Sequence, residues 1–235
     1  MNNSKPATDS KNHDFAVFLQ RFSSKVLWHF TGYRKSESAS YGILNTILES
    51  NTLKLSRQNE KVIMNTDEIR FGGTIACVCD IPFRDLRIHT MRYGPVGIGF
   101  HKAAAINEGH FNPVLYIHRS NPSFIKAHDL IKKNDTIDFT TEQGRALHEY
   151  LGMIGSYMKP SNLDRNIEVD PQIDSSQNNN FYYEREWRTV SEWKFADDSI
   201  TVIVMPQRFL ADFQKRWGNR FVASSIILSE MIETL

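Results

Sequence analysis

The sequence has few cysteines and no long apolar run, and each shortage excludes a class of protein. Its two cysteines, Cys77 and Cys79, stand in "TIACVCDIP". They are too close together for a normal disulfide and too few for a zinc site. No segment approaches the roughly 20 apolar residues that cross a membrane, and the N-terminal "MNNSKPATDSKNHD" lacks the apolar centre of a signal peptide. We therefore expect a cytoplasmic protein with free thiols and no membrane contact.

The sequence also lacks an excess of charge and the common catalytic motifs. Lysine and arginine number 28 against 27 acidic residues, whereas a protein that coats nucleic acid carries a basic excess. A local basic patch remains compatible with this balance. There is no GxxxxGK[ST] phosphate loop, no HExxH, no CxxC and no GxSxG, so the sequence predicts no metal site. The glycines of "GPVGIGF" (94–100) do not complete a GxGxxG pattern, and we interpret them as small strand residues that permit close packing.

The remaining composition predicts an α+β fold. With 235 residues of which 40% are apolar, the chain is long enough for one large domain, and we expect a disordered tail over 1–13 and a single domain over 14–235. Apolar spacing along the chain distinguishes helices from strands. It predicts helices over 15–26, 41–50, 83–94, 103–109, 123–158 and 207–217, strands over 25–31, 52–56, 73–82, 95–102, 112–120, 181–193, 199–206 and 223–229, and a surface loop over 160–180.

The segment 123–158 stands out as a helical insertion between two clusters of strands. Its apolar residues recur at helical spacing, which is typical of a helix face that packs in a core. The stripe predicted to be core consists of Leu147, Tyr150, Leu151, Ile154 and Tyr157.

A polar group stands at the end of the first predicted strand, in "VLWHFTGY". His29 and Thr31 are two residues apart, so both project from one face of an extended chain, whereas Phe30 points to the other face and the core. Imidazole and hydroxyl groups both donate and accept hydrogen bonds, and together they are able to bind a ribose or a carboxamide. A buried histidine with satisfied hydrogen bonds is the alternative interpretation.

A second polar group lies in "YYEREWRTV" (182–190). Strand alternation places Glu184, Glu186 and Arg188 on one face. Charged side chains on a strand face that other elements cover are costly to bury. A carboxylate in such a position is therefore a candidate for catalysis. A solvent-exposed edge strand is the alternative.

The segment "RDLRIHTMRYG" (84–94) gathers several basic side chains, with Arg84, Arg87 and Arg92 close to His89. Arginine side chains bind phosphate and diphosphate groups well. An exposed helix face that contacts only solvent explains the same pattern.

These segments together resemble two known families. "HFT" followed by "SASYGILNTILESNTLKLS", with "EREWRTV" near the end of the chain, resembles DarT-like ADP-ribosyltransferases. "CVCDIPFRDLRIHTMRYGPVGIGFHK" followed by "NPVLYIHR" resembles the AbiGi family of abortive-infection (phage resistance) proteins, over most of residues 25–210.

The DarT-like resemblance implies two facing β-sheets that split around a cleft for NAD, which is the substrate. It implies that Glu186 is the catalytic glutamate, with Glu184 as the other choice, and that it stabilises an oxocarbenium-like transition state. Arg70 is the closest positional match to the family's catalytic arginine. The residues implied to bind NAD are His29, Phe30, Thr31, Tyr41, His89 and Tyr93.

Three functions follow from these resemblances and residues. The first is an NAD-dependent mono-ADP-ribosyltransferase in phage defence, whose acceptor is nucleic acid or protein. The second is a non-catalytic antitoxin or sensor that binds a toxin or a phage component, because AbiGi proteins are labelled as antitoxins. The third is a nuclease that uses glutamate and histidine and requires added Mg²⁺.

Overall fold

The computed structural model describes residues 24–57, 60–64, 67–71, 73–118, 121–123, 126, 138, 140–161 and 184–234. These residues form the expected α+β structure and divide into two compact units. Unit 1 is drawn from Met1–Leu44, Asp80–Ala103 and Asp198–Leu235, and unit 2 from Asn45–Cys79 and Ala104–Asp197. The single domain over 14–235 stays a prediction, and the tail over 1–13, most of the helix over 15–26 and most of the loop over 160–180 lie outside the described residues. The first two residues of that predicted loop belong instead to strand β10 (Met158–Ser161).

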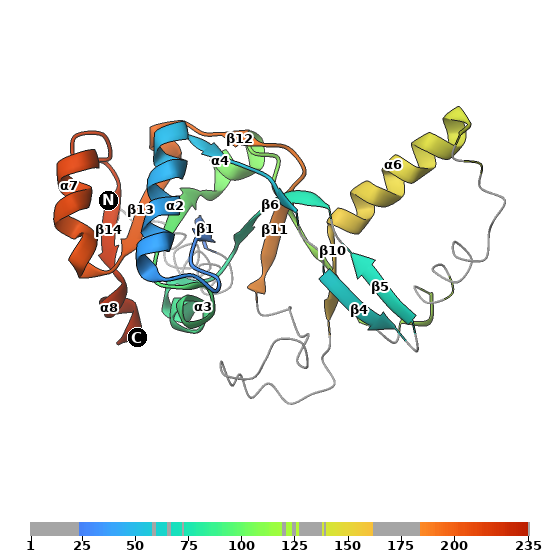
Figure 1. Ribbon diagram of the computed structural model, residues 1–235, viewed down its shortest axis with the longest axis horizontal. Coiled ribbons are helices and arrows are strands. Elements are labelled where there is room, and N and C mark those ends of the chain that lie inside the picture. Colours follow the sequence, from blue (N-terminus) through green and yellow to red (C-terminus); the bar gives the residue numbers. More distant parts are fainter. Residues whose placement is uncertain are drawn as a thin grey trace, which may run out of the picture. The chain divides into compact units, whose positions relative to one another are not determined.

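Unit 1 is built on a mixed sheet in the order β14-β13-β7-β1. The strands β1 and β7 pair antiparallel, as do β7 and β13, whereas β13 and β14 run parallel (Figure 1). The strands are β1 (Val26–Phe30), β7 (Gly97–His101), β13 (Ile200–Met205) and β14 (Ser225–Leu228). The helices of this unit are η1 (Phe83–Asp85), α3 (Leu86–Tyr93), η4 (Gln207–Phe209), α7 (Leu210–Trp217) and α8 (Ser229–Glu233). Of these elements, α8 is one that the sequence did not predict.

The glycines of β7 allow β1 to pack closely against it. A Cβ atom added at Gly97 would lie 2.7 Å from the ring of Phe30, and one added at Gly99 would lie 2.6 Å from Val26. Real Cβ atoms do not approach other heavy atoms so closely, so larger residues would displace the β1 side chains. The interpretation of these glycines as packing residues is therefore confirmed.

Helix α2 (Glu37–Ser50) follows the first strand and begins in unit 1. Its start is explained by Ser36, whose hydroxyl accepts a hydrogen bond from the Ala39 N–H at 3.3 Å, the geometry of an N-cap. Its end is explained by Asn51, which adopts a left-handed backbone with φ of 49°. The helix ends where predicted and begins four residues before the predicted start at 41, and its Leu44 and Leu48 are buried.

Unit 2 consists of several short groups of strands. β11 pairs antiparallel with both β6 and β8, and β6 also pairs with β3. Separate pairs are formed by β2 with β12, by β4 with β5 and by β9 with β10, the last of which is parallel. The strands are β2 (Thr52–Leu53), β3 (Ser56–Arg57), β4 (Glu60–Met64), β5 (Asp67–Phe71), β6 (Thr74–Cys79), β8 (Asn112–Pro113), β9 (Leu115–His118), β10 (Met158–Ser161), β11 (Glu186–Thr189) and β12 (Trp193–Lys194). The remaining elements are α4 (Lys102–Asn107), which begins in unit 1, the turn η3 (Asp197–Ser199) at the border of the units, and α6 (Glu142–Ser156) of unit 2.

The predicted strand over 181–193 is wrong in its extent. Arg185 has a left-handed backbone with φ of 44°, which separates Glu184 from the start of β11. After Thr189 the chain turns, and Trp193 pairs with Leu53 of β2 instead of continuing the ladder with β6. Trp193 packs edge-on against Phe111 and Phe195, with ring centroids 5.7 and 5.5 Å apart, and all three are buried. This aromatic core supplies the reason for the turn.

The prediction that the α6 stripe is core is wrong. Tyr150 is 56% exposed and Leu147 is 38% exposed, and Leu151 and Ile154 are half-buried. In Figure 1 the C-terminal end of α6 joins the start of β10, and the helix extends outward from there. The stripe is therefore a largely uncovered face in the described part of the molecule.

The exposure of α6 predicts a small energetic effect of truncation there. We expect Tyr150→Ala to change the free energy of unfolding by no more than about 0.5 kcal/mol, because an exposed side chain loses little contact area. Leu44→Ala, at a fully buried position of α2, should cost about 2–5 kcal/mol. Urea denaturation of both variants measures this difference, and similar costs would show that the stripe is covered.

Candidate functional site

Four charged side chains meet in the interior of unit 2, around the strand glutamate singled out by the sequence. Lys159, Glu184, Glu186 and Arg188 are all buried. Lys159 Nζ contacts Glu186 Oε2 at 2.5 Å and also donates to Glu184 Oε2. Two cations therefore balance two carboxylates, which is the arrangement that makes buried charge tolerable.

Glu186 and Arg188 also form a two-point ion pair along β11. Arg188 donates from Nε to Glu186 Oε1 at 2.8 Å and from its terminal nitrogen to Oε2 at 3.1 Å. The expectation that these residues share one strand face is confirmed. Both carboxylate oxygens of Glu186 are thus occupied by cations of the same unit.

Arg188 further ties β11 to the segment that ends α6. Its second terminal nitrogen donates to the Ser156 carbonyl at 2.9 Å and to the Met158 carbonyl at 3.3 Å. These carbonyls lie at the last residue of α6 and the first residue of β10, and a helix end needs partners for its free carbonyls. The arginine therefore links three elements, and its side chain is buried completely.

The ion pairs determine the protonation state of Glu186. Burial alone raises the pKa of a carboxyl group, but the charges of Lys159 and Arg188 outweigh it and lower the pKa of Glu186 from 4.5 to about 2. The group is therefore ionised at neutral pH. It is a carboxylate held by cations rather than one poised to exchange a proton near pH 7.

Two further side chains border this cluster without becoming reactive. Cys77, on β6, forms a hydrogen bond with Glu186, and burial together with the negative charge of Glu186 raises the pKa of its thiol well above the usual value. The Tyr116 hydroxyl accepts a hydrogen bond from the Glu186 backbone N–H at 2.7 Å, and burial raises the pKa of Tyr116 as well. Cys77 and Cys79 are free thiols, as expected. Neither the thiol nor the phenol is activated for nucleophilic attack.

Lys159 is the member of this cluster that the sequence did not reveal. It lies 27 residues before Glu186, in a stretch that carries no motif. A covered face that bears two carboxylates and one arginine needs another cation, and that charge imbalance is the signal that predicts such a lysine. Arg70, the other proposed catalytic residue, lies on β5 opposite Lys61, and its side chain is outside the described residues.

The proposed NAD-binding residues belong to unit 1, and there they have structural partners. Thr31 is buried just after β1, and its hydroxyl donates to the Ser40 carbonyl at 2.9 Å. Its backbone N–H donates to the Val96 carbonyl at 3.0 Å. His29 is half-buried opposite Ile98 of β7. The hydroxyl proton of Thr31 is thus engaged in joining the strand end to α2.

Three of these residues form a cluster of rings between β1 and α3. The ring centroids of Phe30 and His89 are 5.3 Å apart, and those of His89 and Tyr93 are 4.4 Å apart. The Gly32 N–H donates to the Tyr93 carbonyl at 2.8 Å, which fixes the end of α3 next to the end of β1. These contacts pack α3 onto the strand, a role that any core aromatic cluster performs.

Tyr41 faces different neighbours. Its hydroxyl donates to Asp212 of α7 at 2.9 Å, and its ring stacks on Phe209 at a centroid distance of 4.4 Å. The structure thus brings together Phe30, His89 and Tyr93, with Thr31 adjacent, and directs Tyr41 toward α7. Glu186 belongs to unit 2, so a cleft that it shares with His29 and Thr31 stays a prediction.

The described residues contain no group of three or more histidine, cysteine or acidic residues arranged to hold a metal ion. Within the same ranges, no helix has the length and apolar character that a membrane span requires.

Residues 43–223 match the family described as "Putative abortive phage resistance protein AbiGi, antitoxin". This match covers most of the chain, so the protein belongs to the AbiGi family. Comparison with curated proteins and with solved structures gave no match.

The buried cluster predicts strong coupling between Lys159 and Glu186. We expect Glu186→Gln to cost about 3–5 kcal/mol of unfolding free energy, because it leaves buried cations without their carboxylate. The double variant Glu186→Gln/Lys159→Met should cost less unfolding free energy than the sum of the costs of the two single variants. Chemical denaturation of the wild type, both single variants and the double variant gives the coupling energy, and simple additivity would contradict the ion pair.

The low pKa of Glu186 predicts how this cost depends on pH. A carboxyl group with a depressed folded-state pKa stabilises the fold above its unfolded pKa, and the contribution is lost as pH falls through the folded value. The cost of Glu186→Gln should therefore be constant above pH 4.5 and should decrease as pH falls from there toward about 2. Unfolding experiments on both proteins at about pH 7, 4 and 3 test this, and a cost that grows on acidification would refute the assignment.

Proposed function

We propose that this protein is the antitoxin of an abortive phage-resistance system and that it acts by binding its toxin. The family assignment supports the antitoxin role, since the family is described as an antitoxin. A protein partner is accordingly the ligand that this role requires. Binding requires a stable surface and no reactive group.

The observation that supports this proposal most directly is the ion pairing of Glu186. ADP-ribosyl transfer requires a carboxylate that approaches the ribose of NAD, and both oxygens of Glu186 are already held by Arg188 and Lys159. A substrate hydroxyl would have to displace a buried cation, which is costly. The ion pairs of Glu186 thus support a binding role better than a working active site.

The same observation changes how the enzymatic alternative is tested. Glu186→Gln is the natural variant for an ADP-ribosyltransferase, but here it removes the charge that balances Lys159 and Arg188. Loss of activity in that variant would then report on folding as well as on chemistry. Nicotinamide release by the wild-type protein is the cleaner measurement.

We expect this protein to relieve the growth arrest caused by one of the genes that adjoin its own, when the two are expressed together. The purified protein should release no nicotinamide from NAD with lysate of phage-infected cells, while an NAD glycohydrolase does so in parallel. Leu44→Asp, which places a charge at a fully buried position, should abolish relief because the fold is lost.

Two results would contradict this function. Release of nicotinamide by the folded wild-type protein would favour the ADP-ribosyltransferase alternative. Failure to relieve any growth arrest, for protein that is soluble and folded by circular dichroism, would remove the antitoxin role.

A further inference from the structure

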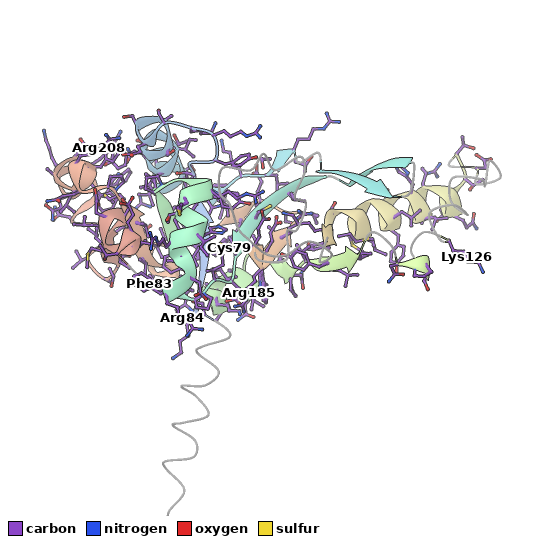
Figure 2. The ribbon with its side chains drawn as sticks, turned by 90° about the horizontal axis from the view of Figure 1, so that it is seen from below. Cys79, Phe83, Arg84, Lys126, Arg185 and Arg208 are labelled. Atoms are coloured by element: carbon purple, nitrogen blue, oxygen red, sulfur yellow. The ribbon has the colours of Figure 1, made fainter. Side chains whose placement is uncertain are left out.

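The outer side of η1 and α3 in unit 1 combines exposed apolar side chains with arginines. Phe83 is 41% exposed, Ile88 46% and Met91 57%, and Arg84 and Arg87 are exposed beside them. Arg84, Arg87, Ile88 and Met91 follow the spacing that places residues on one side of a helix. Figure 2 shows Phe83 and Arg84 next to each other at one end of α3. These five residues are called the α3 face.

The inner side of the same helix is firmly held, so the α3 face is presented by a fixed element. Leu86, His89 and Thr90 are buried, and the ring of His89 packs between those of Phe30 and Tyr93. α8 lies against α3 as well. A rigid helix loses little conformational entropy when it binds a partner.

The arginines of this face form few stabilising ion pairs within the described residues. Arg84 makes an ion pair with Asp85 at 3.6 Å, with both side chains more than half exposed, and such pairs contribute little. No ion pair of Arg87 is found within the described residues. The segment 83–93 holds three arginines and one aspartate, although the whole chain has 28 basic and 27 acidic residues. The segment therefore carries a net positive charge.

The position of these arginines is also unfavourable for the helix itself. Arg84 precedes α3 and Arg87 lies in its first turn, where the helix dipole is positive and Asp85, at the N-cap, is the adjacent acidic residue. Cations at this end destabilise a helix by a few tenths of a kcal/mol, and anions would stabilise it. The helix dipole and the arginines instead add up to a positive potential that attracts an anionic partner.

Resting on the antitoxin function proposed above, we propose that the α3 face is the surface that binds the toxin, through an acidic segment of the toxin that also carries apolar side chains. Arginine, methionine and aromatic residues are the types enriched at protein interfaces. Exposed isoleucine and methionine gain nothing from a phosphate backbone, which favours a protein over nucleic acid. A second copy of this chain is disfavoured, because two α3 faces would place arginines against arginines.

The test uses the toxin whose growth arrest the wild-type protein relieves. The variant Arg84→Glu/Arg87→Glu reverses the charge of the face, and it should fold normally because glutamate suits a helix N-terminus. The matched control is Lys215→Glu/Arg216→Glu, which makes the same change of charge at exposed positions of α7. Melting temperatures by circular dichroism verify that both variants are folded.

We expect the Arg84→Glu/Arg87→Glu variant to bind the toxin about 100-fold more weakly and to lose the relief of growth arrest, since like charges across an interface are repulsive. The control should bind within about threefold of the wild type. Ile88→Ala/Met91→Ala should weaken binding without changing its salt dependence. Wild-type affinity should fall as salt increases.

The outcomes separate this inference from the function on which it rests. If the wild type relieves no growth arrest, the antitoxin function and the toxin site both fail. If the wild type and the Arg84→Glu/Arg87→Glu variant relieve it equally, the antitoxin function stands and the α3 face is not its site. If charge reversal abolishes binding to RNA or to anionic vesicles and leaves toxin binding unchanged, the face serves that other ligand and the proposal is overturned.

Discussion

The contact between Arg188 and Glu186 is the interaction on which the interior of unit 2 depends. It ties β11 to the junction of α6 and β10, because the arginine that balances Glu186 also binds the carbonyls there. Lys159 completes the balance from β10 itself. Charges that would be costly one by one are thus acceptable as a group, and each needs the others in position.

This dependence gives the charges of β11 a structural role. A glutamate next to an arginine on a covered strand suggests chemistry when it is read in sequence alone. In three dimensions the same charges satisfy one another, and the neighbouring thiol and phenol are held in their neutral forms. Exposed apolar side chains occur elsewhere in the described residues, among them those of the α3 face and of α6.

The sequence was informative where local rules decide the structure, and less so where distant residues do. The end of α2, the strand around Trp28 and the packing glycines of β7 follow from local chemistry, and all were predicted. The end of β11 was not, because it depends on Trp193 joining Phe111 and Phe195 in a separate core. The exposure of Tyr150 was missed for a related reason: helical periodicity identifies an apolar face but not whether anything covers it. The pairing of Lys159 with Glu186 likewise joins residues that no local pattern connects.

The hydrogen bond between Cys77 and Glu186 has a practical consequence. Because burial and the adjacent carboxylate keep this thiol protonated, it should react slowly with maleimides, which attack thiolates. Cys79 is buried on the same strand. The native protein should therefore react only slowly with thiol-directed labels. A cysteine introduced on an exposed helix would then carry a fluorophore or spin label at one defined position, and neither natural cysteine would have to be removed.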